Sequence, residues 1–176
     1  MGVKFKPGDI ILFELSGWGF LNPLIGWLIG KYGHVAVFYA YTKRGLPLLI
    51  ESIGRGVLIR TLLASKGRKV AVYRWKGKGS EQVGLKVAVA AEHLADRPES
   101  HYDFFGIAKF LLPRFLFERL GIPFEWYKAD KRFICSELVW QAYRDAGHPI
   151  LTDKKMPLPS DFASEDKLEK VWEGKI

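Results

Sequence analysis

The chain has 176 residues, 48% of them apolar and 26% charged, which is enough for one folded domain over residues 1–176 and excludes a disordered chain. A single cysteine, Cys135, excludes an internal disulfide framework and a cysteine-rich zinc site. The net charge of +8 favours an anionic partner such as an anionic membrane surface, but a solvated lysine-rich surface explains it equally well. No signature of a nucleic-acid-binding protein is present, so we expect no nucleic acid partner.

Five stretches in the first 75 residues are typical of β-strands. Each is rich in β-branched and aromatic residues, and turn-forming glycine, proline or polar residues separate them. Short connections between neighbouring strands favour antiparallel pairing, so we expect a meander of about five strands. The predicted strands cover residues 8–15, 34–41, 48–52, 57–62 and 69–75.

The pattern then changes to helical spacing. Ser80 is placed to cap a helix that runs to about Asp96. A second amphipathic helix is expected from Ser136 onward, with Gly147 in position to end it, and a proline-containing tail closes the chain. An antiparallel sheet followed by segregated helices predicts an α+β fold.

Two apolar stretches, residues 16–30 and 110–126, allow two interpretations. They can be buried in the core, or they can face a lipid surface or line an acyl groove. The first is too short and too broken by glycine and proline for a membrane span. Because the N-terminus also lacks the pattern of a signal peptide, we expect a cytoplasmic protein, with peripheral membrane association as the alternative.

Cys135 lies at or near the start of the second predicted helix. The unpaired N–H groups and the positive dipole end at a helix N-terminus favour a thiolate, which is the reactive form of cysteine. A lone cysteine before an amphipathic helix is also a common small core residue. Cys135 is therefore a candidate nucleophile whose role depends on the presence of a base.

His34 is the candidate base. It opens a predicted core strand, whereas the other three histidines lie in a predicted surface helix, in a loop or beyond the cysteine helix. Glu51, at the end of the adjacent predicted strand, is placed to orient the far ring nitrogen of His34. Both residues can also be explained without catalysis. His34 can be a hydrogen-bonded structural histidine, and Glu51 can be a solvated residue at the end of a strand. The histidines show no metal-ligand spacing, so we expect neither a metal nor a cofactor.

Several short motifs occur in an order that resembles a known family. They are GDIIL (8–12), GHVAVFY (33–39), LIES with GRGV just after it (49–57), YDFFG (102–106) and FICSELVWQAY (133–143). In this order the chain resembles the circularly permuted papain-like cysteine hydrolases, in the YiiX-like branch of the NlpC superfamily. These are related to the lecithin retinol acyltransferase-like proteins. The resemblance covers roughly residues 8–161.

The resemblance implies a permuted papain-like fold, in which a sheet or half-barrel bearing the histidine precedes the cysteine helix. By matching motif, it implies that Cys135 is the nucleophile, His34 the base, Glu51 the residue that orients the base, and Tyr102 a residue of the active-site wall that binds substrate or an oxyanion. The activity implied is that of a thiol amidase or peptidase acting on a peptide or cell-wall-type amide. The alternatives are a lipid acyltransferase or phospholipase that uses the same residues, and a non-catalytic module that binds a lipid or a peptide. The sequence does not indicate the oligomeric state.

Overall fold

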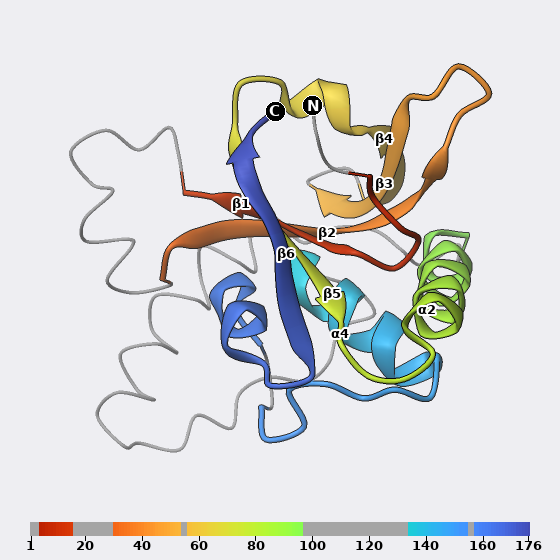
Figure 1. Cartoon of the computed structure of the whole chain (residues 1–176), viewed down its shortest axis with the longest axis vertical. Coiled ribbons are helices and arrows are strands. Elements are labelled where there is room, and N and C mark those ends of the chain that lie inside the picture. Colours follow the sequence, from red (N-terminus) through yellow and green to blue (C-terminus); the bar gives the residue numbers. More distant parts are fainter. Residues whose placement is uncertain (1–3, 16–29, 54–55, 97–133, 155–156) are drawn as a thin grey trace.

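The computed structural model describes residues 4–15, 30–53, 56–96, 134–154 and 157–176 (Figure 1). In these residues it has the α+β composition expected from the sequence. The elements are β1 (Ile10–Glu14), β2 (Tyr32–Tyr41), β3 (Pro47–Ile53), β4 (Gly56–Thr61), the 3₁₀ helix η2 (Leu62–Ser65), β5 (Lys69–Trp75), α2 (Ser80–Ala95), α4 (Cys135–Asp145), the 3₁₀ helix η3 (Pro159–Ser164) and β6 (Leu168–Lys175).

The strands form one six-stranded sheet in the order β4-β3-β2-β1-β5-β6, and the paired neighbours are antiparallel. The first four strands make the expected meander. The expectation that the fifth would extend it is wrong, because β5 pairs with β1 and not with β4. The segment between β4 and β5 forms η2. Thr61, the N-cap of η2, accepts a hydrogen bond from the N–H of Leu63, and Leu62 is buried against the sheet. The chain therefore crosses the sheet before β5 begins.

The last strand, β6, was not expected from the sequence. It pairs along the whole of β5 and forms an edge of the sheet. Its residues, LEKVWEGK, are half charged. Charged side chains are common on edge strands, where one side of the strand faces solvent, and they weaken the apolar alternation by which a strand is recognised.

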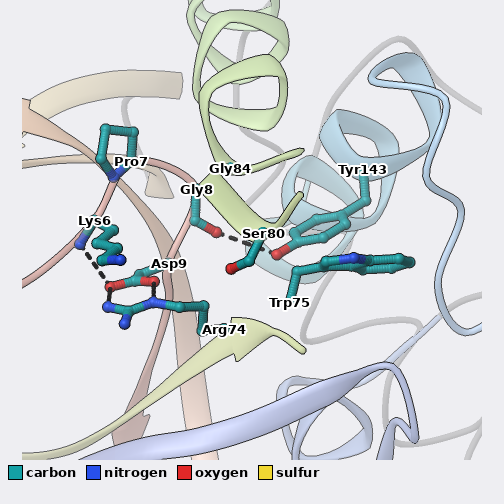
Figure 2. A pocket seen from close by; sticks show the side chains of 9 residues that line it. All are labelled: Lys6, Pro7, Gly8, Asp9, Arg74, Trp75, Ser80, Gly84 and Tyr143. Atoms are coloured by element: carbon teal, nitrogen blue, oxygen red, sulfur yellow. Dashed lines mark hydrogen bonds and ion pairs between the residues drawn. The ribbon is translucent and has the colours of Figure 1, made fainter. Parts of the chain in front are cut away.

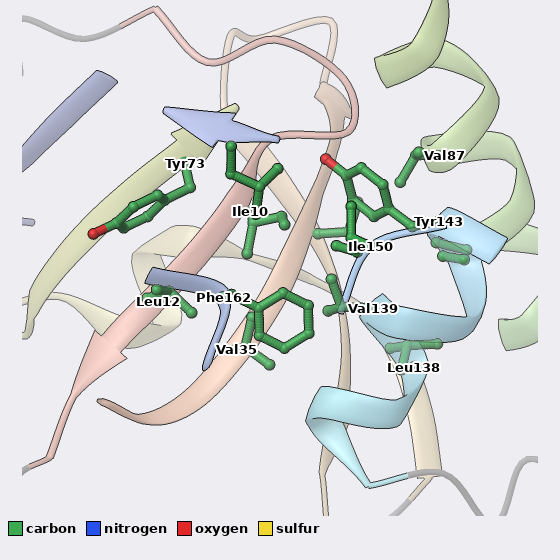
Figure 3. Close-up of a cluster of buried hydrophobic side chains, with 14 of the residues drawn as sticks. Ile10, Leu12, Val35, Tyr73, Val87, Leu138, Val139, Tyr143, Ile150 and Phe162 are labelled. Atoms are coloured by element: carbon green, nitrogen blue, oxygen red, sulfur yellow. The ribbon is translucent and has the colours of Figure 1, made fainter. Parts of the chain in front are cut away.

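Alternate residues of the strands are buried on opposite faces of the sheet. One face packs against α2, α4 and η3, and Figure 3 shows this cluster around Phe162, Val139 and Tyr143. The other face is covered by the N-terminal Phe5, by Leu62 of η2 and by the end of the chain. Burial on both faces fixes the register of the central strands, because a slip of one residue would exchange the two faces.

Helix α2 packs closely on the turn that precedes β1. A Cβ atom at Gly84 would lie 2.1 Å from the carbonyl oxygen of Pro7, so only glycine allows this approach. The helix begins at Ser80 with Gly79 as its N-cap, at φ 73°, so the expectation that Ser80 caps the helix is wrong. The left-handed conformation of Gly79, which glycine adopts without strain, turns the chain into the helix one residue earlier.

The same turn is held by a buried ion pair (Figure 2). Asp9 is 1% exposed and accepts two hydrogen bonds of 2.7 Å from Arg74 of β5 and one of 2.8 Å from the N–H of Lys6. Burial raises the pKa of Asp9, and these hydrogen bonds oppose that rise only in part. The hydroxyl of Tyr143 in α4 donates to the carbonyl oxygen of Gly8. The pocket that these residues line leaves no space for a water molecule, which marks it as packed structure and not a binding site.

Candidate active site

Cys135 is the first residue of α4, so the helix starts one residue earlier than the sequence predicted. The carboxylate of Glu137 accepts a hydrogen bond of 3.2 Å from the N–H of Ile134, which fixes the first turn. At the other end, Gly147 adopts φ 79° and the N–H of His148 donates to the carbonyl oxygen of Tyr143. The helix therefore ends at the predicted glycine, and its N-terminus points the thiol at the sheet.

The thiol meets the sheet where β2 and β3 separate. Their ladder ends at the pair Val37 and Ile50, although β2 continues to Tyr32 along β1 and β3 continues along β4. In this separated part of β2, the N–H of Val35 helps to lower the pKa of the Cys135 thiol. A backbone donor that a continuous sheet would use for strand pairing is thus available to the thiol.

His34 connects the thiol with Glu51. Its Nε2 lies 2.7 Å from Oε2 of Glu51, and its ring is near enough to the Cys135 thiol for each to shift the pKa of the other. Because Nε2 faces the carboxylate, Nδ1 is the nitrogen available to the sulfur. The side chains of His34 and Glu51 are 18% and 6% exposed, so both are largely shielded from water. The ring of Phe13 packs beside the imidazole with the centroids 5.4 Å apart.

The three residues shift one another's protonation. Burial alone would raise the pKa of Cys135, but the charge and hydrogen bond of His34 lower it, and the N–H groups of Val35 and Ser136 add to this effect. Burial alone would lower the pKa of His34. The charge and hydrogen bond of Cys135, followed by those of Glu51, raise it to about 9. Both shifts favour a thiolate beside an imidazolium at neutral pH.

Glu51 is held as a carboxylate from more than one side. Burial would raise its pKa, but the hydrogen bond and charge of His34 and the charges of Arg60 and Arg68 lower it. Nη1 of Arg60 donates to Oε1 of Glu51 at 3.0 Å. Arg68 lies over the ring of Phe13 at 4.8 Å and donates to the carbonyl oxygen of Glu14 at 3.2 Å.

The structure thus brings together three of the four site residues proposed from the sequence: Cys135, His34 and Glu51. The fourth, Tyr102, lies outside the described residues. Sequence reasoning missed Arg60, although a usable signal exists. The short turn between the third and fourth predicted strands places residues 58 and 60 beside Glu51, as the observed pairs Glu51–Leu58 and Leu49–Arg60 show.

The arrangement has the parts needed for nucleophilic acyl transfer. A thiolate at a helix start is adjacent to a protonated imidazole, and a carboxylate fixes the far ring nitrogen. Cys135 is the first residue of α4, and the N–H of a residue in this position can donate to a developing oxyanion. Within the described residues, no group of three or more His, Cys, Asp or Glu side chains is placed to hold a metal ion.

No helix in the described part of the chain is both long enough and apolar enough to cross a membrane. No model of a known protein family matches the chain, and no curated protein sequence matches it. The assignment of a function therefore depends on the geometry of Cys135, His34 and Glu51.

Proposed function

We propose that the protein is a cysteine hydrolase that cleaves an amide bond, in a peptide or a cell-wall-type amide, through a thioester acyl-enzyme. The observation that carries the proposal is the hydrogen bond of 2.7 Å between His34 and Glu51, together with the opposite pKa shifts that His34 and the Cys135 thiol cause in each other. The motif order that resembles the permuted papain-like hydrolases supports the same assignment, because in that family the strand that carries the histidine also precedes the cysteine helix.

In the first half of the reaction the thiolate of Cys135 attacks the carbonyl carbon of the amide. The carbonyl oxygen becomes an oxyanion, to which the N–H groups at the start of α4 can donate. The imidazolium of His34 then donates its proton to the leaving nitrogen as the C–N bond breaks, which leaves a thioester on Cys135 and a neutral imidazole.

In the second half the neutral His34 accepts a proton from water, and the resulting hydroxide attacks the thioester carbonyl. The carbon–sulfur bond breaks, the carboxylic acid is released, and the thiolate and imidazolium are restored. Glu51 keeps the imidazole in the tautomer that presents Nδ1 to the sulfur and stabilises the imidazolium. An ester substrate would form the same thioester intermediate. The three residues therefore fit either an amine or an alcohol as the leaving group, and either water or another nucleophile as the acyl acceptor.

The test is hydrolysis of a panel that contains peptide amides, N-acyl amino acids and phospholipid vesicles, with the Cys135→Ala and His34→Ala variants as controls. We expect release of amine from members of the amide classes by the wild-type protein and none by Cys135→Ala. Release of fatty acid from the vesicles alone would replace the amidase assignment with the lipid-directed alternative. Equal rates for the wild type and Cys135→Ala would remove the hydrolase assignment.

A further inference from the structure

We infer that Arg60 is a positioning residue of this site, which holds the carboxylate of Glu51 in the orientation that faces His34. The inference rests on the proposed function. It assigns a role to an arginine on β4 that contacts the oxygen of Glu51 not used by His34.

The two oxygens of Glu51 have different partners. Oε2 faces Nε2 of His34 at 2.7 Å, and Oε1 accepts from Nη1 of Arg60 at 3.0 Å. A carboxylate held at one oxygen only can rotate about its last bond, because this torsion has a broad distribution. A second hydrogen bond at Oε1, from a planar guanidinium, restricts that rotation and keeps Oε2 on the ring nitrogen.

The surroundings of Glu51 make Arg60 the relevant donor. Arg68 also lowers the pKa of Glu51 through its charge, but its hydrogen bond goes to the carbonyl oxygen of Glu14. The side chain of Glu51 is 6% exposed, so water has little access to replace a lost donor. Loss of Arg60 would therefore leave Oε1 without its guanidinium partner and free the carboxylate to turn away from His34.

The exposure of Arg60 separates positioning from a purely structural role. Its side chain is 39% exposed, so it contributes little as a packing residue. Glu51 keeps its contact with His34 when the guanidinium is removed, so the carboxylate is not left as an unpaired buried charge. A variant that lacks the guanidinium should therefore fold normally, and its defect should appear in the chemistry of the thiol.

The experiment measures the ionisation of Cys135 from the pH dependence of thiolate absorbance near 240 nm in Arg60→Met, Glu51→Gln and the double variant. The Arg44→Met variant removes the same charge at the β2–β3 turn, seven residues from Glu51 and thus on the order of 20 Å away along an extended strand, and serves as the matched control. Since the chain has one cysteine, subtraction of the Cys135→Ala spectrum isolates the signal.

We expect the midpoint for Cys135 to rise in Arg60→Met, toward that of Glu51→Gln, and to stay at the wild-type value in Arg44→Met. The double variant should match Glu51→Gln, because Arg60 acts through Glu51. The melting temperature of Arg60→Met should stay within a few degrees of the wild type.

Two results would overturn the inference: an unchanged or lower midpoint in Arg60→Met, or an undiminished effect of Arg60→Met in the Glu51→Gln background. These outcomes differ from failure of the proposed function. In that case the wild-type thiol itself would titrate near its ordinary pKa of about 8.5 and the His34→Ala variant would not change it.

Discussion

The His34→Ala variant tests how the thiol is activated. In the structure the factors that lower the pKa of Cys135 are, in order, the charge of His34, the hydrogen bond of His34 and the backbone donors of Val35 and Ser136. Removal of the imidazole eliminates the first two and leaves the helix N-terminus and the backbone donors. We therefore expect most of the activation to disappear.

The expected change in the pKa of Cys135 follows from the influences that remain when His34 is removed. A helix N-terminus contributes about 0.3–1 kcal/mol, less than the 1.36 kcal/mol that corresponds to one pKa unit. Burial, which is the largest single influence on Cys135, acts in the opposite direction. In His34→Ala the pKa of Cys135 should therefore return to about 8.5 or higher, where only a few per cent of the thiol is ionised at pH 7.

The assay is thiolate absorbance near 240 nm, titrated from low to high pH. The thiolate midpoint should lie at higher pH in His34→Ala than in the wild-type protein, and the thiolate signal at pH 7 should be smaller in the variant. Subtraction of the Cys135→Ala spectrum removes the contribution of the 7 tyrosines. His93→Ala, which removes an exposed histidine from α2, is the matched control and should behave as the wild type.

A thiolate midpoint in His34→Ala that equals the wild-type midpoint would refute this reasoning. It would mean that the helix start and the backbone donors activate Cys135 and that His34 is only a structural neighbour.

Three further predictions concern Glu51 and the packing that supports the site. Glu51→Gln removes the anionic partner of the His34 imidazolium and should lower the pKa of His34 from about 9. Hydrolysis needs the imidazolium, so its rate falls as pH rises through this pKa. In a pH–rate profile, the alkaline fall should therefore lie at lower pH in the variant than in the wild type. Asp9→Asn leaves Arg74, whose side chain is 19% exposed, without its anionic partner, so the free energy of unfolding in urea should fall by about 3 kcal/mol. Gly84→Ala forces a Cβ atom against a backbone oxygen of the N-terminal turn, so thermal unfolding should show a loss of about 1–3 kcal/mol despite the better helix propensity of alanine.

The two predictions about stability each have a control on the same part of the molecule. Glu81→Gln removes an exposed carboxylate that pairs with Lys6 at 2.6 Å, and it should change stability much less than Asp9→Asn. Lys86→Ala alters an exposed position of α2 and should leave the melting temperature nearly unchanged. Equal losses in Glu81→Gln and Asp9→Asn would contradict the role of the buried pair, and a stabilised Gly84→Ala would contradict the close contact of α2. An alkaline limb in Glu51→Gln that matches the wild type would show that the carboxylate does not act on His34.

The sequence predicted those parts of the fold that depend on local patterns. The strand Lys69–Trp75 was predicted with the observed bounds, and the end of α4 at Gly147 followed from the conformational freedom of glycine. The place of β5 in the sheet was not predictable in the same way. It depends on the burial of Leu62 under the opposite face, a tertiary contact that leaves no periodic signal.

In the candidate site too, residue types were predicted from the sequence, whereas features that depend on tertiary contacts were not. The sequence identified Cys135, His34 and Glu51 by residue type and by position at the ends of elements. In the structure His34 is hydrogen-bonded to Glu51, and its charge lowers the pKa of the Cys135 thiol. The sequence did not identify the separation of β2 from β3 that exposes the N–H of Val35, because the extent of a ladder is set by packing between strands and helices. Arg60 was missed since its role depends on the register of two strands.

The central claim is that Cys135 forms a covalent acyl-enzyme, and mass spectrometry of the protein during turnover of 4-nitrophenyl acetate tests it most directly. We predict an acetyl group on the peptide that contains Cys135, present while substrate remains, lost as substrate is exhausted and absent from Cys135→Ala. Turnover that depends on the folded protein but leaves Cys135 unmodified, or an acetyl group that accumulates on another residue while Cys135→Ala stays equally active, would contradict the account.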